Sequence, residues 1–144
     1  MIIKSFRGLL KDGSIEKINL STNDGRTGYR IVKLALFHAE PGENSAEHTV
    51  KIYSVPQTVA DNSVDFSDQT LLAVAHLADH SDVANPLDHY VVFDNATFNQ
   101  DIYVTHVDTR GSEPCNYYFE LEQFELSLNE QTVATLQDIR NVGV

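Results

Sequence analysis

Histidines and carboxylates are densest between residues 76 and 89, where six side chains could bind a divalent metal: His76, Asp79, His80, Asp82, Asp88 and His89. Imidazole and carboxylate groups are common ligands of such ions. The spacing of His76 and His80 would place both rings on one face only in a helix. The surrounding sequence favours strand and loop, so we interpret these residues as solvated and predict no metal ligand here.

Asp61, Ser63, Asp65 and Asp68 have a spacing that loosely resembles a calcium-binding loop. Such a loop needs a glycine at its sixth position and a glutamate at its twelfth. This sequence lacks that glycine and has Leu72 at the twelfth position. The cluster favours turns in which the carboxylates accept local hydrogen bonds. The sequence therefore predicts no metal and no cofactor.

Glu120, Glu122 and Glu125 could form a glycosidase pair, because carboxylates roughly 5 to 9.5 Å apart can act as acid and nucleophile or base. Glu120 and Glu122 alternate with Phe119 and Leu121, so the pattern predicts that these two face solvent. The metal motif of a cupin, the nucleophile elbow of a serine hydrolase and a phosphate-binding loop do not occur. No catalytic residue is predicted, and we expect a protein that is not an enzyme.

Short apolar runs separated by turn residues recur along the chain and predict strands at 2–10, 15–20, 29–37, 49–55, 71–77, 90–93, 102–107 and 117–128. No linker divides the chain, so 1–144 is predicted to form one domain. About eight short strands followed by one helix are typical of an all-β, antiparallel β-sandwich of the jelly-roll kind.

Three local features add detail to this prediction. Asp12-Gly13 predicts a tight turn and an opening hairpin between 2–10 and 15–20. The strand at 29–37 is apolar on both faces, which predicts a central position in its sheet. In the last strand the apolar positions change phase near Glu122-Gln123, which predicts a β-bulge or a strand that changes sheets there.

Residues 129–144 form a predicted helical tail. Val133, Leu136 and Ile139 fall on one face of a helix expected at 130–140, and Asn129 is the expected N-cap. A helix this short is unstable alone, so its apolar stripe must pack either on its own sheet or on a neighbouring subunit. We favour the neighbouring subunit and predict these three residues as interface residues.

The formal net charge of −11 disfavours a nucleic-acid partner, since phosphate binding needs a basic surface. Residues 1–51 carry eight basic and six acidic side chains, whereas 52–144 carry two basic and fifteen acidic ones. We predict that this acidic segment, through Asp79, Asp82 and Asp88, faces a basic partner surface. The alternative is that the charge only maintains solubility.

The sequence offers no sign of export or of a membrane partner. Its longest apolar run, 71–75, is far below the ~20 residues that cross a bilayer, and the N-terminus lacks the features of a secretory signal. We therefore expect synthesis and retention in the cytosol. Cys115 is the only cysteine, which excludes an internal disulfide, so packing must hold the fold.

Several longer strings resemble one family when read in order: GLLKDG at 8–13, INLST at 18–22, GYRIVK at 28–33, DFSDQTLLAVA at 65–75, NQDIYVTH at 99–106, NYYFELE at 116–122 and TVATL at 132–136. Together they are similar to small all-β virion structural proteins of marine tailed bacteriophages. The resemblance spans nearly the whole chain but contains no catalytic signature.

This resemblance implies a virion component that is assembled in the host cytoplasm. Its expected role is a capsid decoration or cement protein that binds the major capsid protein or other virion proteins as a homo-oligomer, with a trimer favoured. The alternatives are a neck or tail component and a carbohydrate-binding jelly roll for host attachment. The carbohydrate hypothesis stays open because the six tyrosines could stack on sugars, although tryptophan is absent.

Overall fold

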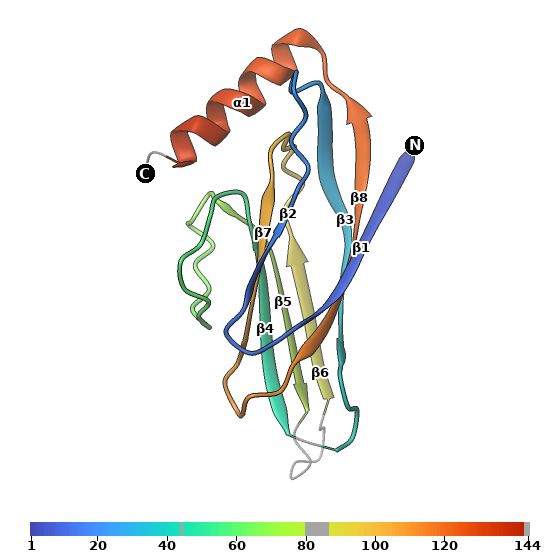
Figure 1. Cartoon of the computed structure of the whole chain (residues 1–144), viewed down its shortest axis with the longest axis vertical. Coiled ribbons are helices and arrows are strands. Elements are labelled where there is room, and N and C mark those ends of the chain that lie inside the picture. The colour runs from blue at the N-terminus through green and yellow to red at the C-terminus, as the bar shows by residue number, and fades with distance from the viewer. Residues whose placement is uncertain (44, 80–86, 143–144) are drawn as a thin grey trace.

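Two antiparallel β-sheets form the body of the protein, and a helix follows the last strand (Figure 1). The structure is a computed structural model that describes residues 1–43, 45–79 and 87–142. The first sheet has the order β1-β8-β3, formed by Ile2–Leu10, Cys115–Glu125 and Thr27–His38. The second has the order β2-β7-β4-β5-β6, formed by Ile15–Ile18, Ile102–Asp108, Ala46–Tyr53, Leu71–Asp79 and Leu87–Phe93. The predicted all-β sandwich is confirmed, and with it the strand predicted at 71–77.

The two sheets differ in their number of strands because β6 belongs to the second sheet. It pairs with β5 at the edge of the second sheet, so the described strands divide into sheets of three and five. An eight-stranded jelly roll would divide them evenly, and that detail of the prediction is not confirmed. The edges of the two sheets stay in contact, because the Leu36 N–H on β3 donates to His89 Nε2 on β6 at 3.4 Å.

The first two strands do not form the predicted hairpin. β1 pairs with β8 in the first sheet, whereas β2 pairs with β7 in the second. The turn between them carries the chain from one sheet to the other, with Gly13 at a φ of 78°. It is bound to β7, because the Gly13 N–H donates to the His106 carbonyl at 2.9 Å and Asp12 accepts from the Asp108 N–H at 2.8 Å. A turn motif such as Asp12-Gly13 indicates only that the chain reverses direction. Contacts between residues far apart in the sequence determine which strand each of the two flanking strands pairs with.

The strand β3 lies at the edge of its sheet, so its predicted central position is wrong. β8 is the central strand, with β1 on one side and β3 on the other. The apolar residues on both faces of β3 result from a register shift against β8 between Ile31 and Lys33. The buried side chains therefore change phase at Val32, as follows: Tyr29 and Ile31 before it, Leu34 and Leu36 after it.

The β-bulge predicted at Glu122-Gln123 of β8 occurs instead on its neighbour β3, between Ile31 and Lys33. β8 pairs with β1 without a shift from Gln123 to Cys115, and it stays in the first sheet throughout. The apolar positions of the sequence change phase at Phe124, near the end of β8, and Leu126 is buried just after the strand ends at Glu125.

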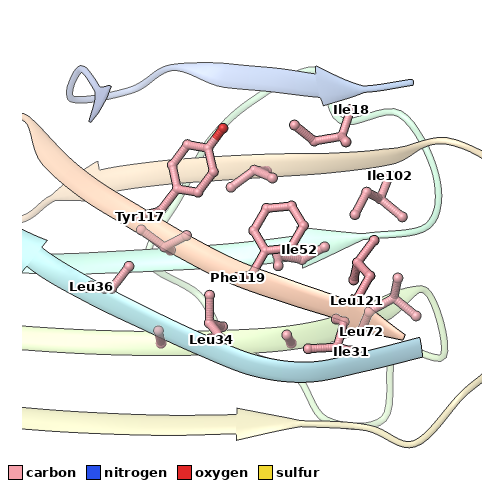
Figure 2. Packing of buried hydrophobic residues seen from close by; sticks show 14 of the residues in the cluster. Ile18, Ile31, Leu34, Leu36, Ile52, Leu72, Ile102, Tyr117, Phe119 and Leu121 are labelled. Carbon is pink, nitrogen blue, oxygen red and sulfur yellow. The ribbon is translucent and has the colours of Figure 1, made fainter. Parts of the chain in front are cut away.

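The core lies between the two sheets (Figure 2). Eight of its residues are 0% exposed: Val50, Ile52, Ala75, Ile102, Val104, Cys115, Phe119 and Leu121. Phe119 stacks on Phe6 and Tyr117, with ring centroids 5.2 and 5.7 Å away. Figure 2 shows this ring directed from β8 toward the second sheet. This apolar centre is what holds the two sheets together.

The helix α1 spans Leu128–Val142, and its N-cap is Ser127 rather than the predicted Asn129. Ser127 Oγ accepts from the Glu130 N–H at 3.2 Å, and Glu130 Oε1 accepts from the Ser127 N–H at 3.3 Å. This reciprocal pair is a capping box, and it places Asn129 inside the first turn. Within the described ranges, no helix is long and apolar enough to cross a membrane.

Candidate functional site

The apolar stripe of α1 points away from the sandwich. Val133, Leu136 and Ile139 are 56, 59 and 61% exposed. The opposite side of the helix contacts the body, where Ala134 is 8% exposed and Thr135 Oγ1 accepts a hydrogen bond from Asn99 Nδ2 at 3.1 Å. The stripe therefore does not cover its own sheet and remains available to another surface.

The three aspartates predicted to face a partner have different environments. Asp79 is 7% exposed in β5. Asp82 lies outside the described residues, and Asp88 belongs to β6 rather than to the loop predicted there, with its side chain also outside the description. Because Asp79 is buried within the chain, it does not present a free surface charge as the prediction required.

The aspartates of the suspected calcium loop close local turns, as the sequence predicted. Asp65 accepts from the Ser67 N–H at 2.9 Å and Asp68 from the Thr70 N–H at 2.9 Å. Asp61 has an additional role, because it accepts from Lys51 Nζ at 2.7 Å. These hydrogen bonds account for the turns in this segment.

Lys51 fixes the long connection between β4 and β5 to the outer face of the second sheet. Its side chain is only 2% exposed, and its ammonium also donates to the Ser63 carbonyl at 2.5 Å. Burial alone would lower the pKa of Lys51, but hydrogen bonds to Asp61 and Tyr53 and the charges of both groups raise it above its ordinary value. No local motif in the sequence singles out this lysine.

The glutamates of β8 lie on the outer face of the first sheet. Glu122 accepts from Arg30 Nε at 2.6 Å, and Glu120 accepts from the Tyr118 hydroxyl at 2.6 Å. Both carboxylates are therefore bound to neighbouring surface side chains. This arrangement agrees with the predicted solvent-facing role better than with an acid and base pair.

A cluster of polar side chains lies inside the sandwich, at the end where β3 and β7 finish and where β4 and β8 begin. It consists of His38, His48, His106 and Cys115, which we call the histidine cluster. Strand register brings these residues together, because His38 pairs with Cys115 and His106 pairs with Val50 beside His48. The donor atoms of His48, His106 and Cys115 all lie within 4.8 Å of one another, and the three residues are at most 1% exposed.

Hydrogen bonds determine where the protons lie in the histidine cluster. His106 Nδ1 is 3.0 Å from the Lys11 carbonyl, which can only accept, so Nδ1 carries the proton. His106 Nε2 is then an acceptor, and it lies 2.9 Å from His48 Nδ1, which donates. His38 continues the group, with its ring centroid 5.3 Å from that of His48.

Burial favours the uncharged forms of His48, His38 and Cys115. It lowers the pKa of His48 to about 4, aided by the charge of His106 and opposed by that of Asp108. It also lowers the pKa of His38 and raises the pKa of the Cys115 thiol to about 12. Neutral imidazole is the form that donates a lone pair, so the cluster presents basic nitrogens in a region of low dielectric.

One nitrogen of the histidine cluster lacks a hydrogen-bond partner, and a small cavity lies beside the cluster. His38 Nε2 is buried and has no hydrogen-bond partner among the described residues. Next to it is a cavity of about 10 Å³, lined by His38 and His48 together with Glu113, Pro114 and the chain around Glu40. A volume of this size holds about one water molecule or one ion.

The histidine cluster cannot be recognised in the sequence, because its members lie far apart in the chain and none belongs to a local motif. Part of the signal was present: His106 follows Ile102 and Val104 in alternation, and Cys115 precedes Tyr117 and Phe119 in the same way, which places both on inner faces. What the sequence could not provide was the pairing of β4 with β7 and of β3 with β8.

Comparison with known proteins adds no assignment for either site. No protein-family model matches this chain, and no curated protein matches it significantly.

Proposed function

We propose that this chain is a structural protein of a tailed-phage particle and serves as a capsid decoration or cement protein without enzymatic activity. The observation that carries the proposal is the apolar stripe of α1, whose three side chains are 56 to 61% exposed. A contiguous apolar surface on a soluble domain marks a contact with another macromolecule. The resemblance to virion proteins supplies the kind of partner, namely the major capsid protein or another protein of the particle.

The size of the stripe favours binding as a symmetric oligomer. Fully burying a Val, Leu or Ile side chain stabilises by roughly 1.5–3 kcal/mol, and these three are already partly covered, so docking gains about 3–5 kcal/mol. Association costs an estimated 4–15 kcal/mol, so a single helix contact does not hold one subunit. A homo-oligomer, with a trimer favoured, repeats the contact on a symmetric capsid and gains from effective concentration.

A binding experiment on particles that lack this protein tests the proposal. Substituting Val133→Ser, Leu136→Ser and Ile139→Ser together should abolish co-sedimentation with the particles. The matched control is Gln137→Ser, an exposed polar position on the same helix. Undiminished binding by the triple variant would rule out docking through α1, and light scattering on both variants reports whether the same face also holds the oligomer.

A second candidate function is carbohydrate binding on the outer face of the first sheet. A depression of about 660 Å³ lies there, lined by Phe37 and Tyr118 together with Arg7, Lys33 and Asn116. Phe37 is 67% exposed, and an exposed aromatic ring beside polar groups is suited to stacking on a sugar. On a glycan array, Phe37→Ala would lose any signal, whereas Phe66→Ala, an equally exposed ring elsewhere, would keep it.

A further inference from the structure

The histidine cluster has the composition and the surroundings of a metal site. Two imidazoles and a thiol from three different strands place their donor atoms within 4.8 Å of one another in the interior. The His106 ring is oriented by the Lys11 carbonyl at 3.0 Å, and metal-binding histidines are usually oriented by such a bond from their second nitrogen. His38 Nε2 adds a buried nitrogen without a partner.

We propose that the histidine cluster binds one Zn²⁺ ion through His48, His106 Nε2 and Cys115 Sγ. The fourth position falls to a water in the adjoining cavity of about 10 Å³, or to His38 if its ring, whose centroid is 5.3 Å from that of His48, moves closer. A mixed set of imidazole and thiolate donors suits zinc and disfavours magnesium and calcium, which prefer oxygen.

The required rearrangement is small. Zn–N bonds of about 2.0–2.1 Å in a tetrahedron place two nitrogens roughly 3.3 Å apart, against the 2.9 Å that now separates His48 Nδ1 from His106 Nε2. The hydrogen bond between the rings is therefore replaced by two bonds to the metal, with a movement of a few tenths of an ångström. The thiol, which now lies 3.8 and 3.5 Å from the carbonyl oxygens of Phe37 and Asn116, must leave these acceptors and approach the two nitrogens more closely.

Zinc binding changes the proton positions of two groups. Both imidazoles bind as neutral rings, and His48 gives up its Nδ1 proton and takes one at Nε2, so its net charge stays the same. Cys115 binds as the thiolate, so its S–H bond breaks, a Zn–S bond forms and one proton leaves to the solvent. At neutral pH the reaction releases one proton for each ion bound.

The position of the site gives this metal a structural role. Cys115 belongs to the first sheet, whereas His48 and His106 belong to the second. A single ion would therefore cross-link the two layers at the end of the sandwich, in a chain whose only cysteine cannot form an internal disulfide. A ligand that binds only the folded state raises its stability.

Metal titration of the full chain tests this inference. Purified protein is stripped with a chelator, kept under a reductant that is not a thiol, and given Zn²⁺ or Co²⁺ both in the native state and during refolding, so that access to the interior does not limit binding. Zinc at about a hundredfold over its Kd should raise the Tm by roughly 5–10 °C. Cobalt should show tetrahedral visible bands and a thiolate-to-metal charge-transfer band.

Three variants separate this site from other binding. Cys115→Ala should lose the charge-transfer band and most of the Tm shift, and His106→Gln, which preserves an amide to contact Lys11, should do the same. His76→Gln is the matched control, because His76 bonds Thr49 outside the cluster and should retain both signals. Absence of the cobalt bands and of a zinc-dependent Tm shift in the wild-type chain would overturn the inference, as would a shift that survives in Cys115→Ala.

Discussion

His48 Nδ1 lies 2.9 Å from His106 Nε2 in the interior, although the two residues are 58 positions apart in the sequence. Two neutral rings can share the proton of this hydrogen bond, since one donates and the other accepts. Two protonated rings would both be donors and would repel each other. The contact therefore links the packing of β4 against β7 to the pH of the solution.

We expect stability to fall in mild acid. His48 has an ordinary pKa near 6.5 when unfolded and about 4 when folded, with His38, His106, His76 and Asp108 facing it. The fold favours the neutral ring, so its contribution is complete above pH 6.5, declines as the pH falls and is lost near pH 4. The loss is on the order of 3 kcal/mol.

Urea unfolding between pH 7.5 and pH 4.5, in the presence of a chelator, measures this dependence. The variant His48→Gln should show a much flatter profile over the same window. Asp108, whose pKa is lowered by backbone hydrogen bonds despite its burial, affects stability only below its ordinary pKa of 3.8. Profiles of equal slope in the wild type and the variant would contradict the role assigned to His48.

Asp61→Ala should destabilise the protein by about 1–2 kcal/mol, because it leaves the buried ammonium of Lys51 without its carboxylate. Lys51→Met should lower the free energy of unfolding by less than Asp61→Ala does, because it leaves no buried charge without a counter-ion. In the Lys51→Met background, Asp61→Ala should have little further effect. The control is Asp65→Ala, which breaks a similar turn without a lysine, and equal costs for the two aspartates would refute the pairing.

Ser127→Ala should weaken the start of α1 by about 1 kcal/mol, because it removes the acceptor for the Glu130 N–H. Asn129→Ala should be nearly neutral, as Asn129 lies within the first turn. Hydrogen exchange of the helix amides is the suitable measurement, since it detects local fraying that global unfolding overlooks. Faster exchange in Asn129→Ala than in Ser127→Ala would restore Asn129 as the cap.

Phe119→Ala should cost about 3–5 kcal/mol, because this ring is 0% exposed and stacks on two other aromatic side chains. Phe37→Ala removes a ring of the same size that is 67% exposed, and it should change the free energy of unfolding by less than about 0.5 kcal/mol. Chemical denaturation of the two variants provides the comparison. A small effect at Phe119 would mean that the core is packed differently.

The sequence predicted the strands and the helix better than their partners. Alternation located the strands because it depends only on neighbouring residues, as in the strand at 71–77. The Asp12-Gly13 hairpin failed because β1 and β2 find their partners about 90 to 120 residues later, in β7 and β8. The predicted cap at Asn129 is wrong because Ser127 and Glu130 have the spacing of a capping box, a signal that the helical periodicity of the apolar residues does not contain.

The candidate sites show the same division. The stripe of α1 could be predicted because Val133, Leu136 and Ile139 repeat with the period of a helix. The histidine cluster could not, because His38, His48, His106 and Cys115 meet only after four strands have found their register. Chemistry that depends on long-range pairing leaves no local spacing in the sequence.

The most direct test of the proposed function is the location of this protein on the phage particle to which we propose that it belongs. An N-terminal tag suits gold labelling, because Met1 is 93% exposed and belongs to a different part of the chain from α1. Electron microscopy of labelled particles should show gold at regularly repeated positions over the capsid surface. Gold confined to the neck or tail, or particles without gold, would contradict the assignment as a capsid decoration protein.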